Sequence, residues 1–187
     1  MWAGVDVGGR RKGFHCAVLS GDHVLSLARF ATPAEVVDHL VRHAPELTAI
    51  DSPISLARDG ERSRRCERDF VAAAICNLRY TPDRAGLESN PSYYEWIEHG
   101  LALFAECRKR GLGVIECFPT ASWTVWSGKR GSMRRSTWTT QALAHQNLTG
   151  LPSRMNQDFR DAVAAALTAR AHERGLSTCF GDIVVPS

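Results

Sequence analysis

The segment Trp2-Ala3-Gly4-Val5-Asp6-Val7-Gly8-Gly9, near the amino terminus, is the stretch on which the expected fold depends. It is an apolar run of the length of one strand, and the two glycines at its end, Gly8 and Gly9, mark a turn. Residues 13–20 and 23–30 are two further apolar runs, joined by the turn Ser20-Gly21-Asp22. Three short strands connected in this way predict an antiparallel meander.

Helices and strands alternate in the rest of the chain. Thr32-Pro33-Ala34-Glu35 predicts a helix start, because threonine is a good N-cap, proline suits the first helical position and glutamate completes a capping box. A strand that returns after a helix pairs in parallel with its predecessor. Such strands are expected at residues 47–51 and 113–118, a terminal edge strand at residues 183–185, and helices at residues 69–77, 94–110, 138–148 and 157–173.

This order predicts a mixed α/β fold with a five-stranded sheet, composed of the antiparallel meander and two parallel strands and flanked by helices. It is the order of the ribonuclease H-like and actin-like superfold. At 187 residues, one core can bury roughly 70% of the surface of the unfolded chain. We therefore expect a single domain over residues 1–187, with an irregular insertion around residues 79–94, where turn-forming residues are frequent.

The composition argues against several classes of protein. The chain does not start with a basic region followed by a long apolar run, so no signal peptide is expected. No stretch approaches the roughly 18 apolar residues of a transmembrane helix. With neither a signal peptide nor a transmembrane helix expected, the predicted location is the cytoplasm. The six cysteines form no C-x-x-C pair and have no matching histidine spacing, so a structural zinc site is not expected.

Five acidic residues are the candidate catalytic and metal-binding residues. Asp6 lies within the first predicted strand, where an acid is disfavoured unless function or pairing holds it. Asp51 ends the fourth strand, and Glu116 lies within the fifth. Asp158 and Asp161, spaced i and i+3, project from one face of the last long helix. Taken singly, Asp6 could cap the glycine turn and Asp158 could interact with the helix dipole.

A cluster of carboxylates favours a metal site. Neighbouring carboxylates repel one another and raise each other's pKa values, and a divalent cation relieves the repulsion. Hard oxygen ligands suit Mg²⁺ or Mn²⁺, and two such ions about 4 Å apart can activate water and stabilise the leaving oxygen of a phosphodiester. The acids therefore predict a metal-dependent nuclease, a hydrolase with Mg²⁺ or Mn²⁺ as its cofactor and nucleic acid as its partner.

Cationic side chains flank the acids. The formal net charge of +3 does not identify a partner, but nearly all cations are arginines, which favour bidentate contacts to phosphate. Genomic base composition would also explain this preference, and the first basic segment could be a solvated hairpin turn. The predicted substrate-binding residues are Arg10, Arg11, Lys12, Arg64, Arg65, Arg68, Lys129 and Arg130.

Aromatic and histidine residues give weaker signals. Tryptophans near the last basic segment would suit stacking on unpaired bases, although tryptophan more often serves packing; they are Trp123, Trp126 and Trp138. His15 and His145 have no ligand spacing and are expected to be structural or surface residues. The sequence leaves open whether the substrate is RNA, DNA, a branched junction or a small nucleotide, and whether the protein forms a homodimer.

The sequence resembles the predicted ribonuclease H-like nucleases that form the family called domain of unknown function four-two-nine. The resemblance implies a ribonuclease H-like core over nearly the whole chain. In the pattern of that family the position of Asp158 often holds histidine, so Asp161 is the stronger candidate. The matching segments are Gly4-Val5-Asp6-Val7-Gly8, Ala49-Ile50-Asp51-Ser52-Pro53, Arg65-Cys66-Glu67-Arg68, Glu116-Cys117-Phe118-Pro119-Thr120-Ala121 and Asp158-Phe159-Arg160-Asp161-Ala162.

The acids are also similar in arrangement to the sites of bacterial Holliday-junction resolvases. Those sites use one acid on the first strand, one on the fourth and two at i and i+3 on a late helix. Asp6, Asp51, Asp158 and Asp161 fall on these positions, whereas Glu116 has no counterpart there. The resemblance thus implies a nuclease site built around these four aspartates, without Glu116.

Two other functions compete with a nuclease. An actin-like phosphotransferase would share the loop Asp6-Val7-Gly8-Gly9, but those proteins need two such lobes and this chain supplies one. A non-catalytic nucleic-acid-binding module of the same fold would use only the basic loops. It would gain nothing from a negative cluster, and binding of a divalent metal separates it from the nuclease.

Overall fold

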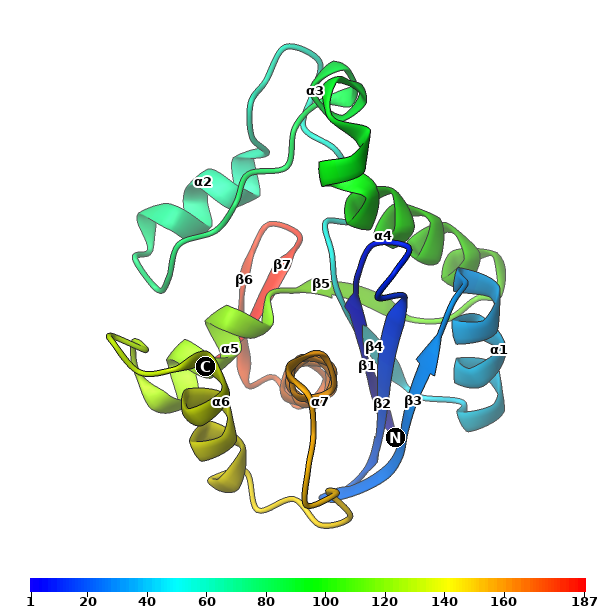
Figure 1. Cartoon of the computed structure of the whole chain (residues 1–187), viewed down its shortest axis with the longest axis vertical. Coiled ribbons are helices and arrows are strands. Elements are labelled where there is room, and N and C mark those ends of the chain that lie inside the picture. The colour runs from blue at the N-terminus through cyan, green and yellow to red at the C-terminus, as the bar shows by residue number, and fades with distance from the viewer.

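A computed structural model describes residues 1–187 and contains one sheet of seven strands in the order β3-β2-β1-β4-β5-β7-β6 (Figure 1). The first three strands pair antiparallel, as expected. β4, β5 and β7 extend the sheet in parallel from β1, and β6 closes it antiparallel to β7. The strands are β1 Trp2–Val7, β2 Phe14–Ser20, β3 His23–Phe30, β4 Leu47–Asp51, β5 Val114–Cys117, β6 Ser177–Phe180 and β7 Ile183–Pro186.

The prediction of five strands was wrong, because the carboxyl terminus adds a hairpin to the sheet. β7 is an interior strand beside β5, rather than the expected edge strand, and β6 forms that edge. The turn between them contains Gly181, whose φ of 56° lies in the left-handed region that favours glycine. β6 has only four residues, none of them buried, so it lacks the apolar alternation that identifies a strand in a sequence.

Helices cover both faces of the sheet (Figure 1). α1 and α4 contribute to the core on one face, where Val36 and Leu103 pack with Val5 of β1. α7 crosses the other face, and α5 and α6 pack against it from outside. The helices are α1 Pro33–His43, α2 Arg65–Ala72, α3 Arg84–Ser89, α4 Pro91–Lys109, α5 Pro119–Ser127, α6 Arg135–Ala144 and α7 Gln157–Glu173.

The contact between α7 and the sheet is unusually close and fixes the position of the helix. A Cβ atom on Gly4 would lie 2.1 Å from the backbone nitrogen of Ala166 and 2.2 Å from the carbonyl oxygen of Ala162, so only glycine fits there. The helix presents alanines to the strands, and these are fully buried. Small residues on both sides thus bring the amino-terminal turn of α7 over the carboxyl ends of β1 and β4.

Several helix boundaries differ from the sequence-based expectations. The segment expected to be irregular contains α3, whose N-cap Asp83 accepts a hydrogen bond from the backbone of Gly86 at 2.8 Å, and the first turn of α4, which begins at Pro91. α2 begins at Arg65, earlier than expected, because Glu67 closes a capping box. α5, which begins at Pro119, was not predicted. No helix combines the length and apolar character needed to cross a membrane.

Candidate active site

A row of polar side chains crosses three neighbouring strands beneath α7. Asp6 of β1 is in register with His15 of β2 and with Asp51 of β4. Residues in register on adjacent strands point to the same face, and the strands lie about 4.8 Å apart. The first turn of α7 adds Asp158 and Asp161 above this row. Four of the five predicted acids therefore meet at one edge of the sheet.

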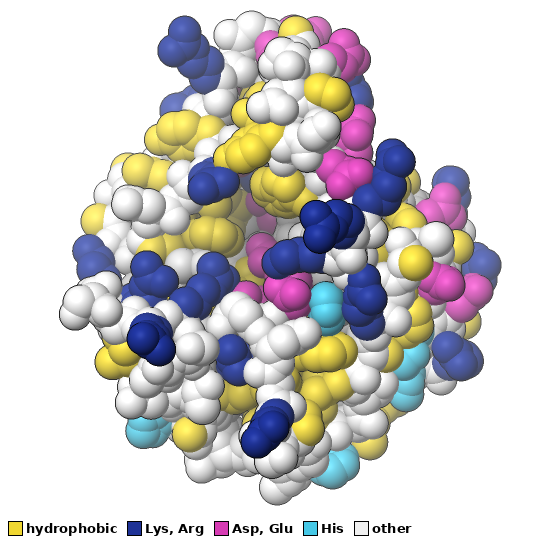
Figure 2. Space-filling view, viewed as in Figure 1, with side chains coloured by type: hydrophobic (Ala, Val, Ile, Leu, Met, Phe, Trp, Pro, Cys, Tyr) yellow, Lys and Arg dark blue, Asp and Glu magenta, His cyan; other side chains and the backbone are white.

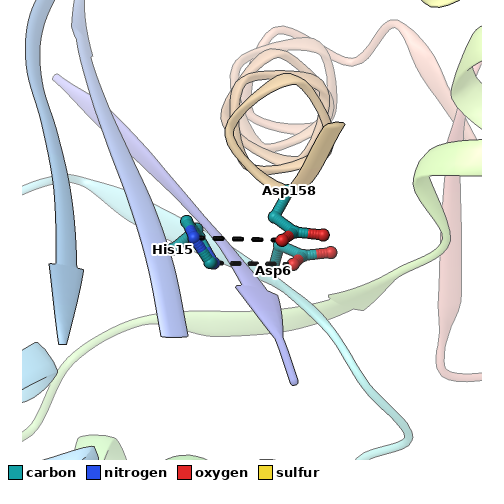
Figure 3. Close-up of side chains that lie close together, drawn as sticks. All are labelled: Asp6, His15 and Asp158. Atoms are coloured by element: carbon teal, nitrogen blue, oxygen red, sulfur yellow. Dashed lines mark ion pairs between the residues drawn. The ribbon is translucent and has the colours of Figure 1, made fainter. Parts of the chain in front are cut away.

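Asp6, His15 and Asp158 converge from β1, β2 and α7 (Figure 3). His15 Nδ1 lies 4.0 Å from Asp6 Oδ2, and His15 Nε2 lies 3.9 Å from Asp158 Oδ2. The imidazole is buried and its Nδ1 has no hydrogen-bond partner. Phe159 packs edge-on against the ring at a centroid distance of 4.8 Å and restricts its orientation. His15 thus offers an unpaired nitrogen beside two carboxylates.

Asp161 is held by three side chains. Its Oδ1 accepts hydrogen bonds from Trp123 Nε1 at 2.8 Å and from Gln157 Nε2 at 3.0 Å, and its Oδ2 accepts one from Arg135 Nη2 at 2.9 Å. Burial raises the pKa of Asp161, while Arg135, Trp123 and Gln157 oppose this rise. Asp161 is therefore a fixed carboxylate, and Trp123 serves the site through its ring nitrogen.

The cluster carries more negative charge than its surroundings balance. Burial, followed by the carboxylates of Asp161 and Asp158, raises the pKa of Asp6 to about 8. Burial and then Asp6 and Asp161 raise the pKa of Asp51 well above the ordinary carboxyl value. The cationic neighbours are Lys12, whose Nζ lies 3.0 Å from Asp158 Oδ1, and Arg135. Two cations thus face four acids.

The donor atoms fit a hard divalent cation. One ligand atom from each of Asp6, His15 and Asp158 lies within 4.8 Å of the other two, close enough for a common ion. Carboxylate oxygens are the ligands that Mg²⁺ and Mn²⁺ prefer, and the unpaired nitrogen of His15 is a further donor. A cation would also relieve the repulsion that raises the pKa values of Asp6 and Asp51.

Glu116 is not part of this row of acids, although its charge contributes to the raised pKa of Asp51. It is in register with Ile50 rather than Asp51, so its side chain points to the opposite face of the sheet, while the next residue, Cys117, packs against α7. Arg64 binds Glu116 with two hydrogen bonds of 2.7 and 2.5 Å. Burial raises the pKa of Glu116, and Arg64 counteracts it. The geometry thus gives Glu116 an arginine, not the acids, as its partner.

The predicted substrate-binding cations fall into three groups. Arg64 is buried and binds Glu67 and Glu116, so it is not the free surface cation that the sequence suggested. Four others form ion pairs: Arg10 with Glu95, Lys12 with Asp158, Arg65 with Asp69 and Arg68 with Glu61. The third group is exposed and forms no ion pair; it consists of Arg11, Lys129 and Arg130.

Residues 4–184 match the family described as Protein of unknown function (DUF429). The chain belongs to this family. The resemblance expected from the sequence is thereby confirmed for this DUF429 protein. A search of curated proteins found no match to its sequence.

Two solved structures share the fold of this DUF429 protein. A structure of RuvC from Thermus thermophilus aligns over 92% of this chain and 95% of its own with 17% identity and a TM-score of 0.52. A structure of the T. thermophilus RuvC in complex with Holliday junction substrate aligns over 92% and 94% with 16% identity and a TM-score of 0.57. The fold is thus a mixed α/β fold similar to RuvC, which is ribonuclease H-like.

His15, Gln157 and Arg135 were missed as site residues of this DUF429 protein. His15 had been expected to be structural or on the surface. The sequence feature that could have identified His15 is its position inside an apolar strand pattern, because a polar residue at an interior position needs a partner. Gln157 lies four residues before Asp161 on the same helix, a spacing that could have indicated the contact, whereas nothing local in the sequence connects Arg135 with Asp161.

Proposed function

We propose that this protein is a divalent-metal-dependent nuclease that hydrolyses phosphodiester bonds of a nucleic acid. The observation that carries the proposal is the convergence of Asp6, Asp51, Asp158 and Asp161 at one edge of a RuvC-like sheet. The acids lie where the first and fourth strands end and where the last long helix begins. A structure of RuvC with a Holliday junction substrate shares this fold and supports nucleic acid as the class of substrate.

The proposed metal ligands are Asp6, Asp51, Asp158 and Asp161, with His15 as a further donor. A bound Mg²⁺ or Mn²⁺ would polarise the scissile phosphate and activate water. Trp123, Gln157 and Arg135 hold the carboxylate of Asp161 in place. Asp6 and Asp51, each on a strand, present their oxygens from a rigid base.

Two residues take other roles in this proposal. Lys12 neutralises Asp158 and lies at the edge of the site, where its exposed ammonium group can approach a phosphate. Glu116, saturated by Arg64 and by the backbone of Ile54, has a structural role. The proposed metal set is therefore smaller than the five acids that the sequence suggested.

A non-catalytic nucleic-acid-binding module is the alternative that the basic residues would support. The four clustered aspartates argue against this alternative, because carboxylates repel phosphate and destabilise one another when no cation is bound. No second phosphate loop accompanies Gly8 and Gly9, which leaves the actin-like phosphotransferase without support.

The experiment that tests the nuclease uses four labelled substrates: a single strand, a duplex, an RNA–DNA hybrid and a four-way junction. We expect cleavage of at least one of them in Mg²⁺ or Mn²⁺, none in EDTA, and a loss to background in Asp6→Asn and Asp161→Asn. The matched control is Asp59→Asn, since Asp59 is exposed and makes no ion pair. Cleavage that persists in EDTA, or equally in all variants, would contradict the proposal.

Substrate affinity should depend on Lys129 and Arg130. Both are exposed and line a groove of about 530 Å³ together with Arg135. Their joint replacement by alanine is expected to reduce the slope of log affinity against log salt by about 1 to 2, since each lost phosphate contact releases one fewer counterion. Fluorescence anisotropy of a labelled oligonucleotide in EDTA measures the slope, and Lys109→Ala, on α4, is the control. An unchanged slope would exclude both residues from the binding surface.

A further inference from the structure

A pocket of about 420 Å³ opens beside Asp51, at the end of β4. It lies among β5, α4 and the segment that joins α2 to α3. Figure 2 shows this face hollowed near its centre, with acidic side chains at the bottom of the hollow, hydrophobic side chains above it and lysines and arginines on both sides. Its volume lies within the range of roughly 300–1,000 Å³ found for sites of small ligands.

The charged groups in the pocket floor are already paired with one another. Arg64 binds both Glu67 and Glu116, and Glu67 also accepts hydrogen bonds from Thr81. The other charged groups of the lining are Asp51 of the acidic cluster, Arg135, which binds Asp161, and Arg79, which makes no ion pair. The walls add half-buried aromatic and aliphatic surface from Trp96, Phe118 and Leu78. The interior thus suits a flat, uncharged ring.

Polar groups without partners lie in the wall as well. The segment 77–79 is neither helix nor strand, and no hydrogen bond within the protein uses its backbone. Peptide N–H and C=O groups can donate to and accept from the edge of a heteroaromatic ring. The side chain of Asn77 is exposed beside them and makes no hydrogen bond, and an amide can do both.

The pocket continues into the cationic groove. Asn77, Thr120 and Arg135 line both the pocket and the neighbouring groove that contains Lys129 and Arg130. A ring in the pocket would therefore have phosphate-binding cations on one side and the carboxylate cluster, through Asp51, on the other. A ring attached to phosphates is a nucleotide.

We propose that this pocket binds one unpaired nucleobase of the substrate strand, next to the phosphate that is cleaved. The inference rests on the proposed function and names its substrate class: single-stranded or locally unpaired nucleic acid. A base inside an intact duplex is stacked and cannot enter such a pocket without being extruded.

The test is a binding measurement in EDTA, where the strand stays intact. Single-stranded oligonucleotides in which one base at a time is replaced by an abasic site are compared with a duplex of the same sequence. We expect the single strand to bind more tightly than the duplex and one abasic position to weaken binding roughly 10-fold, as loss of one stacked base does. Trp96→Ala should weaken binding of the intact single strand by a similar factor. In this variant, the abasic site at the sensitive position should no longer lower the affinity.

Trp126→Ala is the matched control, because Trp126 is half-buried like Trp96 and does not line the pocket. It should change affinity less than twofold. A second measurement needs no variant: 2-aminopurine at the sensitive position should change its fluorescence when the parent protein binds. The proposal would be overturned by any of three results: equal affinity for duplex and single strand, equal effects of both tryptophan variants on affinity, or unchanged 2-aminopurine fluorescence at every position.

The outcome is separable from that of the proposed nuclease. If the parent cleaves in Mn²⁺ while neither Trp96 nor any single base affects binding, the nuclease stands and the base pocket is wrong. If no substrate is cleaved but binding depends on Trp96 and on one base, the pocket stands and the nuclease is wrong.

Discussion

Replacing Arg64 by Met is expected to lower the free energy of unfolding by roughly 3–5 kcal/mol, because it leaves two buried carboxylates without their cation. Arg64 is 6% exposed and lies between Glu116 and Glu67, which are 4% and 1% exposed. Methionine replaces most of the aliphatic stem, so the lost ion pairs dominate the effect. Urea unfolding at neutral pH measures it.

The neighbouring residue provides the control for Arg64. The side chain of Arg65 is 88% exposed, and its only ion pair is a 3.7 Å contact to Asp69. Arg65→Met should therefore change stability by less than about 0.5 kcal/mol. The double variant Arg64→Met/Glu116→Gln should recover part of the loss, since it removes one unpaired charge. Equal effects of Arg64→Met and Arg65→Met would show that the buried network does not stabilise the fold.

In the metal-free protein, Asp6→Asn is expected to increase stability at pH 8. The pKa of Asp6 is about 8 in the folded protein, well above its ordinary value, so the folded state holds a proton that the unfolded chain releases. Stability of the parent should therefore fall as pH rises from about 4 to about 8. Asparagine resembles the protonated acid and does not titrate, so the variant lacks this loss. The difference should be on the order of 5 kcal/mol at pH 8 and near zero at pH 4.

Melting curves in EDTA between pH 4 and pH 9 measure this difference. A gain of about 5 kcal/mol corresponds to roughly 10–20 °C in a protein of this size. Asp59→Asn is again the control and should follow the parent at every pH. A variant that melts below the parent at pH 8 would show that the carboxylate of Asp6 is stabilised by its surroundings, contrary to the repulsion argued above.

The positions of Asp6, Asp51, Asp158 and Asp161 could be anticipated because each depends on a strong local signal. The strand pattern around residues 2–7, the strand end before Ser52 and the helix beginning near Gln157 all have clear sequence signatures. Their order along the chain then indicates one edge of a sheet.

The placement of Glu116 could not be anticipated, because it depends on strand register. Shifting the pairing of a strand by one residue moves every side chain to the other face of the sheet. The short strand β5 carries Glu116 in register with Ile50, and no local feature of the sequence specifies this. For the same reason the partner of Glu116, Arg64, was read as a surface cation.

The strand β6, which pairs with the expected strand β7, and the helix α3 were missed for another reason. Each is short, and β6 is partly exposed, so tertiary contacts rather than local pattern stabilise them. The same holds for the pocket beside Asp51, whose walls come from segments far apart in the sequence.

A calorimetric titration of Mn²⁺ into the metal-free parent and into Asp6→Asn at neutral pH tests whether the four converging acids form a site for a divalent cation. We predict saturable binding by the parent and an affinity at least roughly 10-fold lower for the variant, which loses one hard anionic ligand at nearly constant volume. If the parent does not bind Mn²⁺, or if both proteins have the same dissociation constant, the four aspartates do not form a divalent-cation site.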